Sequence, residues 1–352
     1  MKIAIDTLPL SSGHRFRGMG MYTRNLIDSL IIESRNSKDV TIDAFDFLNN
    51  KDRLKNFDLL HYPYFDLFKT SLPLYSSKPF VVTVPDVIPL IYPKYYPPGV
   101  RGRIKYTYQK IALSRAVGVI TISETSKKDV VRFLNIPQQK IFVTYLAPNF
   151  KIAKVNNIQK LKIAKKYNIP HNFVLYLGDV NWNKNVVSLI EAIKKTDQTL
   201  VIVGKQAASV DYDKSHIENA PILEIQNKYS NDSRVLRLGY VQNDDLNAIW
   251  QMATLYCQPS LYEGFGLPLL EAFDAGVPVI ASKTQALVEV GEDACEYFDP
   301  HDVVGLSRKI SSLVQNSAER NKLLTKGKAR LKDFSWRNTA KETIAAYKLA
   351  LA

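Results

Sequence analysis

The chain has 352 residues, of which 46% are hydrophobic and 23% charged, and its formal net charge is +13. This length predicts two domains, and the composition is typical of soluble globular proteins. The longest apolar run, "FVVTVPDVIPLIY", is interrupted by Pro85, Asp86 and Pro89, which excludes a membrane span there. The start, "MKIAIDTLPL", is too short and too acidic for a secretory signal, and the two cysteines lack metal-like spacing. We therefore expect a cytoplasmic protein without disulfides or bound metal.

The positive charge is concentrated in the first half of the chain. Residues 1–150 hold 21 Lys/Arg against 12 Asp/Glu, whereas the remainder holds 26 against 22. The segments "RGRIKYTYQK" and "SKKDVVRF" carry much of this surplus. Nucleic acid, anionic lipid headgroups or an acidic substrate could be attracted to such a surface, and a solvated helix face is the plain alternative. No helical recognition motif accompanies the charge, so we expect no nucleic-acid partner and retain peripheral contact with an anionic membrane, at its inner face, as a hypothesis.

Short apolar runs alternate with helical patterns through the first 150 residues. Amphipathic spacing predicts helices at "MGMYTRNLIDSLIIES" and "TSKKDVVRFL". The predicted strands are short, apolar and bounded by turn residues: "KIAIDT", "VTIDAF", "DLLHY", "FVVTV", "VGVITI" and "KIFVTY". His61, in "DLLHY", comes at the end of a predicted strand and could face the cleft where a ligand would bind. This alternation predicts a doubly wound parallel sheet.

The same pattern restarts after a segment without strand character, 148–172, which contains Pro148 and Pro170. Helices are predicted at "NVVSLIEAIKKT", "NDDLNAIWQMA" and "PLLEAFDA". The predicted strands of this half are "FVLYLGD", "TLVIVG", "RVLRLGY", "LYCQ", "VPVIAS" and "CEYFDP". The fold class is therefore α/β, with two Rossmann-like doubly wound parallel-sheet domains. Ligands of such sheets gather at the carboxyl ends of the strands, so two facing sheets predict an interdomain cleft.

The stretch "PSLYEGFGLPLLEAFDAGVPVIAS", residues 259–282, sets two carboxylates around a glycine turn. A strand ends before it, Pro268 suits the first helical position, and Gly276 suits the end of the helix. Glu263 is then expected in the loop, and Glu271 in the first turn of the helix. Glycines 264 and 266 allow close backbone approach, and the N–H groups of 264–267 favour a phosphate. Glu271 could accept hydrogen bonds from ribose and Glu263 from another polyol; a capping acid and a solvated loop acid are the alternative.

Over nearly its whole length, the chain resembles the family-4 retaining glycosyltransferases with the GT-B fold, and among them bacterial mannosyltransferase-like enzymes. The residues that carry the resemblance are those of the glycine-turn stretch together with six further segments. In the second half these are "VLYLGDVNWNKN", "RVLRLGYVQNDDLNAIWQMATLYCQPS" and "FSWRNTAKETIAAYKLAL", and in the first half they are "IDTLPLSSGHRFRGMGMYTRNL", "VVTVPDVIPL" and "ITISETSKKDV". It implies an acceptor-side domain, 1–150, a nucleotide-sugar donor domain, 151–334, and a terminal helix, 335–352, that returns to the first domain. The implied reaction is transfer of a mannose- or glucose-type hexose, with retention, to a saccharide or lipid-linked acceptor in surface polysaccharide or glycoconjugate synthesis. The implied donor is a nucleotide sugar, GDP-mannose favoured over UDP- or ADP-sugars, with no other cofactor.

The resemblance also implies the site. Glu263 would hold the hydroxyls of the sugar, Lys184 would neutralise the leaving diphosphate, and Asp86 would lie near the transferred sugar, together with Ser123. Glu271 would bind the ribose of the donor. The resemblance implies three further groups of donor-binding positions. The backbone of Gly264, Phe265, Gly266 and Leu267 would face the diphosphate, and Gly18 and Gly20 would lie in the phosphate-facing loop of the first domain. Tyr240 and Val241 would contact the base through their backbone.

Three positions depart from the usual family pattern. Pro85 replaces a histidine, Asn183 replaces an arginine beside Lys184, and Asp179 replaces a second phosphate-binding arginine. Lys205, or Arg15 and Arg17, could supply the missing charge. These departures keep two alternatives open, a non-catalytic nucleotide-sugar binding protein and a GT-B sugar-nucleotide epimerase.

Overall fold

The computed structural model describes residues 1–11, 18–35 and 39–352. Within these residues the chain divides into two compact units. Unit 1 contains Met1–Asn149 together with Phe334–Ala352, and unit 2 contains Phe150–Asp333. Each unit has its own buried hydrophobic cluster around its own sheet.

Unit 1 is built on a parallel sheet that has six strands in the described residues, in the order β2-β1-β3-β4-β5-β6. The strands are β1 (Lys2–Asp6), β2 (Thr41–Phe45), β3 (Leu59–Tyr62), β4 (Phe80–Thr83), β5 (Gly118–Thr121) and β6 (Ile141–Val143). The helices are α1 (Leu8–Ser11), α2 (Gly18–Ser34), α3 (Ile88–Ile91), α4 (Gly99–Ser114), α5 (Glu124–Asp129) and α14 (Trp336–Leu351). Strands β3, β4 and β5 are buried along their whole length, as expected for a parallel sheet covered on both faces.

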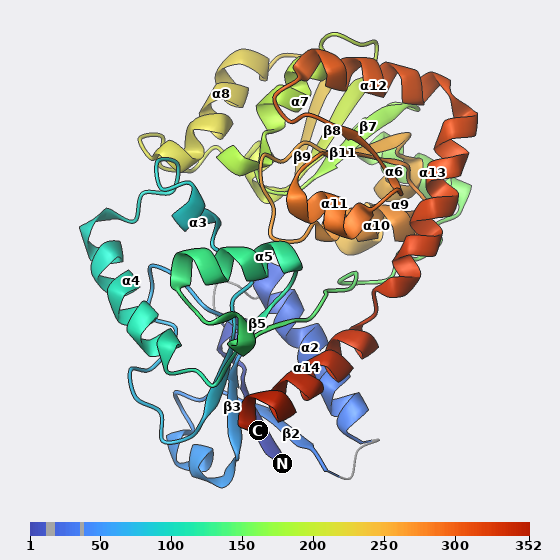
Figure 1. The fold of residues 1–352 in the computed structure, drawn as a ribbon. Helices are drawn as coiled ribbons and strands as arrows, with labels where there is room; N and C mark the ends of the chain where they lie inside the picture. Colours follow the sequence, from blue (N-terminus) through green and yellow to red (C-terminus); the bar gives the residue numbers. More distant parts are fainter. Residues whose placement is uncertain (12–17, 36–38) are drawn as a thin grey trace. The chain divides into compact units, whose positions relative to one another are not determined.

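The last helix, α14, packs on α2 in unit 1, and Figure 1 shows the two helices, red and blue, side by side. Ser335 caps its start by accepting a hydrogen bond from the N–H of Asn338, at 3.1 Å. The Trp336 indole donates to the carbonyl of Pro148 at 2.8 Å, and the Thr339 hydroxyl donates to that of Tyr145 at 2.6 Å. The segment 334–352 is therefore anchored to the end of the 1–149 segment by side-chain hydrogen bonds as well as by apolar packing.

Unit 2 repeats the architecture with the strand order β12-β11-β10-β7-β8-β9. Its strands are β7 (Phe173–Leu177), β8 (Thr199–Val203), β9 (Val235–Gly239), β10 (Leu255–Gln258), β11 (Val279–Ser282) and β12 (Cys295–Phe298). Its helices are α6 (Asn157–Tyr167), α7 (Val186–Ile193), α8 (Ala220–Tyr229), α9 (Asn243–Met252), α10 (Leu267–Ala275), α11 (Gln285–Gly291), α12 (Val303–Gln315) and α13 (Ser317–Arg330). All five strand pairings are parallel. This is the strand order of dinucleotide-binding Rossmann domains.

Helix α7 shows how the sequence pattern produces this packing. Val186, Leu189, Ile190 and Ile193 recur at helical spacing, and all four are completely buried. Burial of each such side chain stabilises the fold by about 1.5–3 kcal/mol. The helix follows directly after Asn185, which adopts a left-handed conformation at φ 55°, one that asparagine tolerates better than most residues. The start of α7 is thereby fixed just after the 178–184 segment.

In the part of the chain that the structure describes, no helix combines the length and the apolar character needed to cross a bilayer. The predicted α/β class with two parallel sheets is confirmed.

Candidate active site

The order in which strands are added to the sheet of unit 2 reverses between β7 and β10, although all strands remain parallel. From β7 the chain builds β8 and β9 on one side, and from β10 it builds β11 and β12 on the other. The segments that leave the carboxyl ends of β7 and β10 must diverge at this point, which is where open α/β sheets bind their ligands. Lys184 lies on the segment after β7, in a short 3₁₀ helix, η4 (Trp182–Lys184), and Glu263 lies on the segment after β10.

An ion pair joins these two segments. The Lys184 ammonium donates to both carboxylate oxygens of Glu263, with Nζ 2.8 Å from Oε1 and 2.9 Å from Oε2. Gln258 Nε2 and Ser260 Oγ also donate to Oε1, at 2.7 and 2.6 Å. Glu263 is only 8% exposed, and such a buried carboxylate is tolerated because these groups compensate its lost hydration. The carboxylate is thus held in one orientation before any ligand arrives.

Asparagines fix the geometry of the two segments around the ion pair. The Asn183 side chain donates to the carbonyl of Tyr262 at 3.0 Å, and the N–H of Leu261 donates to the carbonyl of Asn183 at 2.7 Å. Asn185 Nδ2 donates to the carbonyls of Pro259 and Pro300, at 3.1 and 2.9 Å. Asn183, noted in the sequence only for replacing an arginine, therefore positions the loop that carries Glu263. The run "NWNKN", which begins four positions after the last residue of β7, is the sequence signal that could have indicated this role. Asparagine both hydrogen-bonds backbone groups and accepts left-handed conformations.

The glycine turn ends in a conformation that requires glycine. Gly266 has φ 110°, and a Cβ there would lie 2.6 Å from Cδ2 of Leu287. Because Gly266 ends the turn, α10 begins at Leu267, one residue before Pro268. Glu271 is then the fifth residue of α10, so the prediction that it lies in the first turn is wrong; it lies at the start of the second. The loop 263–266 that precedes the helix is buried throughout.

Glu271 is the second acid of the motif and has a different environment. It is 5% exposed, and in the described part of the chain its carboxyl has no hydrogen-bond or ion-pair partner. Burial raises the pKa of Glu271 from its ordinary value of 4.5 to about 8. At neutral pH the unliganded carboxyl is therefore largely protonated, and donors supplied by a ligand would be needed to favour its ionised form.

The other donor-side positions lie further along the same edge of the sheet. Tyr240 and Val241 directly follow β9, which is separated from β7 by β8. Tyr240 is 69% exposed, whereas Val241 is buried. Lys205 follows β8 and is exposed. Asp179, at the position of the missing arginine, accepts a hydrogen bond from the Tyr176 hydroxyl through its backbone carbonyl, at 2.6 Å.

The residues assigned to the first domain lie in unit 1. Gly18 and Gly20 were expected in a loop, and this is wrong, because both belong to the first turn of α2. The loop before them, with Arg15 and Arg17, lies outside the described residues. Asp86 accepts a hydrogen bond from the N–H of Ile88 at 3.1 Å at the start of α3, and Ser123 caps α5.

His61 is completely buried rather than placed on the ligand-binding edge. Its Nδ1 lies 2.6 Å from the Tyr347 hydroxyl, and its Nε2 lies 2.8 Å from the Thr83 hydroxyl. Burial lowers the pKa of His61 to about 3, so the imidazole is neutral. The hypothesis that His61 faces a ligand-binding cleft is therefore wrong, because the side chain is enclosed in the core of unit 1.

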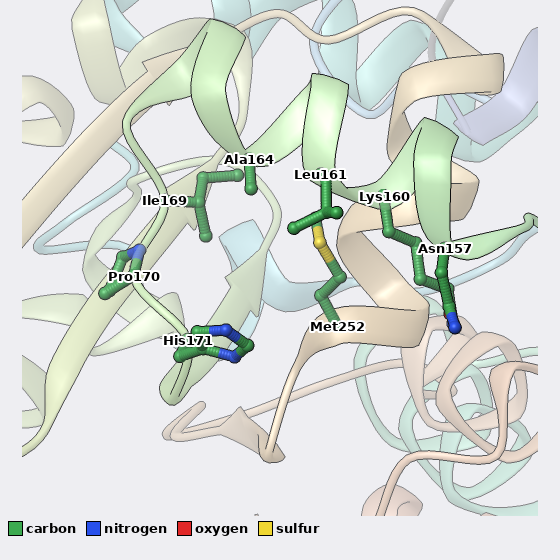
Figure 2. A pocket seen from close by; sticks show the side chains of 8 residues that line it. All are labelled: Asn157, Lys160, Leu161, Ala164, Ile169, Pro170, His171 and Met252. Atoms are coloured by element: carbon green, nitrogen blue, oxygen red, sulfur yellow. The ribbon is translucent and has the colours of Figure 1, made fainter.

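A cavity of about 460 Å³ in unit 2 is distinct from the ion pair. Figure 2 shows its lining from α6, the end of α9 and the segment before β7, with Leu161, Ile169 and Met252 among the apolar groups. His171 lies two positions before β7 and Met252 three positions before β10. The cavity is therefore at the amino ends of the strands whose carboxyl ends lead to Lys184 and Glu263. Among the described residues no cluster of three or more His, Cys, Asp or Glu could hold a metal ion.

Comparison with known proteins places this site in a family. The model of "Glycosyl transferases group 1" matches residues 158–330, the part of unit 2 that contains the ion pair and the glycine turn. The "O-antigen chain mannosyltransferase B" of Escherichia coli is 30% identical over 278 residues, which are 76% of this chain and 70% of that protein. The chain belongs to the group 1 glycosyltransferases.

Solved structures show that the fold of this group 1 glycosyltransferase is GT-B. A sucrose-phosphate synthase from Thermosynechococcus elongatus aligns over 99% of this chain and 98% of its own, with a TM-score of 0.70 and 18% identity. Anabaena HepE, solved in complex with UDP and glucose, aligns over 99% of both chains, with a TM-score of 0.71 and 15% identity. The expected GT-B fold is confirmed by these structures, and the family match and the curated relative show that the chain is a glycosyltransferase.

Proposed function

We propose that this glycosyltransferase transfers a mannose-type hexose, with retention, from a nucleotide sugar to a saccharide or lipid-linked acceptor in surface polysaccharide synthesis. The observation that carries the proposal is the Lys184–Glu263 ion pair at the carboxyl ends of β7 and β10. A basic and an acidic group are held together where the strand order reverses, and they can bind the diphosphate and the sugar of a sugar diphosphate. The ammonium is suited to the phosphate oxygens and the carboxylate to the sugar hydroxyls.

Lys184 acts on the charge that develops during transfer. As the bond from the anomeric carbon to the phosphate oxygen breaks, its electron pair stays on the leaving diphosphate. A cation positioned before the reaction stabilises this charge, and one such donor contributes about 3–4 kcal/mol. The backbone of residues 264–267, at the start of α10, faces the same diphosphate in this proposal, where the helix dipole favours negative charge.

Glu263 holds the sugar rather than attacking it. Its carboxylate already accepts hydrogen bonds from Lys184, Gln258 and Ser260, which occupy the oxygen lone pairs that a nucleophile would need. Retention then follows from attack of the acceptor hydroxyl on the face that the diphosphate leaves. The acceptor oxygen bonds to the anomeric carbon, and its proton passes to an oxygen of the released diphosphate.

Glu271 binds the ribose hydroxyls of the donor in this proposal, since it is a buried carboxyl without a protein partner among the described residues. GDP-mannose is the favoured donor because the curated relative reported above is named as a mannosyltransferase. UDP-sugars are the main alternative, since HepE was solved with UDP and glucose. No metal is assigned a role.

A non-catalytic nucleotide-sugar sensor is the competing function, favoured by Pro85, Asn183 and Asp179 at positions where the family uses histidine and arginine. Thermal shifts with GDP-mannose, UDP-glucose and ADP-glucose identify the donor, because a ligand that binds the folded state raises its stability. Release of the nucleoside diphosphate in the presence of an oligomannoside acceptor then separates enzyme from sensor.

Lys184→Met tests the ion pair in the same assay, and Lys166→Met is its matched control. Lys166 also forms a lysine–carboxylate pair, 2.6 Å from Asp245, but on α6 and α9 rather than at the carboxyl ends of the strands. We expect the rate of nucleotide release to fall by two orders of magnitude or more in Lys184→Met and to stay unchanged in Lys166→Met. This factor corresponds to the ~3–4 kcal/mol that one preorganised donor contributes to the transition state. Tight donor binding without release under any acceptor contradicts the proposal and supports the sensor.

A further inference from the structure

A glutamine is buried beside the ion pair of unit 2. Gln258 is the last residue of β10, and its side chain is almost completely enclosed. Leu255 and Cys257 belong to the hydrophobic cluster of unit 2. Because side chains alternate along a strand, Tyr256 and Gln258 share the opposite face of the sheet, where the Tyr256 ring packs on Trp250 at a centroid distance of 5.0 Å. A buried amide lowers stability unless its polar atoms are hydrogen-bonded, so its partners decide its role.

The Gln258 amide is held in one orientation. Its oxygen accepts a hydrogen bond from the Tyr256 hydroxyl, and its nitrogen donates to Ser260 Oγ at 2.8 Å and to Glu263 Oε1 at 2.7 Å. The reversed orientation would place the amide oxygen against a carboxylate oxygen, and two acceptors repel each other. Burial raises the pKa of Tyr256 well above its ordinary value, so its hydroxyl remains a donor. The hydrogen bonds from Tyr256 through Gln258 therefore run in one direction and end on Glu263.

The two carboxylate oxygens of Glu263 differ as a result. Oε1 accepts hydrogen bonds from Lys184, Gln258 and Ser260, at 2.8, 2.7 and 2.6 Å. Among the described residues, Oε2 accepts only from Lys184, at 2.9 Å. A carboxylate oxygen has two lone pairs, so three donors leave Oε1 without capacity for another, whereas Oε2 retains some. A ligand hydroxyl that reaches this carboxylate therefore finds one available oxygen.

We propose that Gln258 is a positioning residue of sugar transfer, which holds Oε1 of Glu263 so that Oε2 alone accepts a hydroxyl of the donor sugar. The inference rests on the proposed function, in which Glu263 binds the sugar. Lys184 bridges both oxygens, so it cannot by itself distinguish them. Gln258 and Ser260 bind one oxygen only, and they keep it when the ammonium turns toward a diphosphate. The orientation of the sugar-binding oxygen is thus set from the end of β10.

Gln258→Leu in the full chain tests the proposal, because leucine has nearly the same size but no polar atom. The probes are GDP-mannose and GDP, which differ only in the sugar, or UDP-glucose and UDP where the thermal shifts select uridine. We expect kcat/KM for the nucleotide sugar to fall by about ten- to a hundredfold, since a hydrogen bond to a charged group is lost. The inhibition constant of the free nucleotide should stay within a factor of about two, because no sugar is present. A merely structural defect of unit 2 would weaken both.

Gln258→Glu adds a pH dependence that a structural role would not produce. Two carboxyls that share one site retain a proton to higher pH, because both cannot ionise without repulsion. While protonated, the introduced acid donates to Oε1 as the amide does; once it ionises, two anions face each other and Glu263 is displaced. We expect kcat/KM, as a ratio to that of the unaltered chain, to fall about tenfold or more between about pH 5.5 and pH 8.5. The other titratable groups near Glu263 are unaltered and cancel in this ratio; they are Lys184, Tyr176, Tyr256 and Glu271.

Gln109 of unit 1 is the matched control. It is also a completely buried glutamine, and its side-chain oxygen accepts hydrogen bonds from the N–H and hydroxyl of Ser71, at 2.9 and 2.7 Å. Gln109→Leu and Gln109→Glu should lower thermal stability without separating nucleotide sugar from nucleotide and without adding the pH dependence. Tyr256→Phe, which removes the donor to the Gln258 oxygen, should lower kcat/KM by several-fold. It keeps the proposal testable if Gln258→Leu fails to fold, which circular dichroism detects.

Glu263→Gln separates this inference from the proposed function. If Glu263→Gln keeps its kcat/KM, the acid does not hold the sugar, and both are wrong. If Glu263→Gln loses activity while the Gln258 variants and Tyr256→Phe match the unaltered chain, only the positioning role of Gln258 is wrong. Equal losses for nucleotide sugar and nucleotide in Gln258→Leu also overturn that role. A crystal structure with GDP-mannose gives the direct observation: we expect a sugar hydroxyl on Oε2, and a hydroxyl on Oε1 in place of Gln258 contradicts the proposal.

Discussion

The two sheets have related topologies but carry opposite kinds of chemistry toward their carboxyl ends. In unit 1, His61, Thr83, Tyr22 and Tyr347 form a fully buried network in which each link joins uncharged groups. In unit 2, Lys184 and Glu263 form a charged pair supported by Gln258 and Ser260, and the Lys184 side chain is 24% exposed. The first arrangement fastens helices α2 and α14 to the sheet, whereas the second keeps charge at the point of strand reversal.

The comparison teaches that strand topology selects a place for chemistry but does not supply it. A neutral imidazole has one donor and one acceptor nitrogen, and two hydroxyls satisfy both, so the His61 ring has no further hydrogen bond to offer a ligand. A lysine–carboxylate pair keeps unused donor and acceptor capacity, and its charges can be redirected when a ligand with complementary charge enters. The following changes are designed to break or sharpen this contrast, from the largest expected effect to the smallest.

The largest effect is expected from the charged pair. Lys184→Met and Glu263→Gln should each lower kcat for sugar transfer by about two to three orders of magnitude, since each removes one preorganised polar group. The double variant should lose little more than either single variant, because the two side chains act as a unit. Steady-state nucleotide release measures all three. Tyr347→Phe, in the neutral network, is the control and should leave kcat within a factor of two or so.

Strict additivity of the two single losses would contradict the interpretation, since it would mean that Lys184 and Glu263 contribute separately.

The second effect is a loss of unit 2 stability as pH rises from 4.5 to 8, and it acts through Glu271. Its folded-state pKa of about 8 lies above the ordinary 4.5, so its stabilising contribution is complete below pH 4.5 and is lost as pH rises toward 8. The loss is on the order of 4 kcal/mol. Glu271→Gln should remove this pH dependence. Urea unfolding in a Trp336→Phe background measures it, because the remaining Trp182 and Trp250 both belong to unit 2.

A donor that binds through Glu271 should release a proton at neutral pH. Calorimetric titrations in buffers of different ionisation enthalpy detect this proton, and a binding enthalpy independent of the buffer would exclude the role.

The third effect has the opposite sign and belongs to unit 1. The folded-state pKa of His61 is about 3, below the ordinary 6.5, so its contribution is complete above pH 6.5 and is lost as pH falls through that range. Asp6 acts in the other direction, because burial raises its pKa to about 6.

The informative quantity is therefore the difference in the free energy of unfolding between the unaltered chain and His61→Gln. This difference should shrink by up to a few kcal/mol between pH 6.5 and pH 4. Fluorescence of Trp336 in a Trp182→Phe/Trp250→Phe background reports on unit 1, and a difference that stays constant with pH would contradict the buried, neutral imidazole.

The smallest effect separates two glycines at the ends of α10. Both have positive φ, 110° at Gly266 and 69° at Gly276, but an added Cβ meets Leu287 at 2.6 Å only at Gly266 and meets open space at Gly276. Each alanine substitution should cost about 1–2 kcal/mol of stability from backbone strain. Only Gly266→Ala should also weaken donor binding, by several-fold, because the loop that carries Glu263 must shift. Thermal unfolding and donor titration distinguish the two, and equal donor affinities would remove Gly266 from the site.

The sequence predicted the α/β class and the family correctly because both rest on local signals. Alternating strand and helix patterns define the elements, and the glycine-turn stretch has a specific spacing of Glu263, Pro268 and Glu271. The sequence-based prediction was wrong about where helices α2 and α10 begin. Gly18 and Gly20 were expected in a loop, and Glu271 was expected one turn earlier. Helix ends depend on cap conformations such as φ 110° at Gly266, which only the folded backbone sets.

The amino-acid sequence by itself determined which residues carry chemistry and which segments form strands, because these follow from side-chain type and from the period of apolar residues along the chain. Only the tertiary structure decided which of those residues meet. Lys184 and Glu263 are 79 positions apart, yet their side chains touch because β7 and β10 are neighbours in the sheet. His61 and Tyr347 are 286 positions apart and are joined by the packing of α14 on unit 1. Ionisation followed from the same packing, since burial removes water from Glu271 and His61, and the sequence alone does not specify how much water each retains.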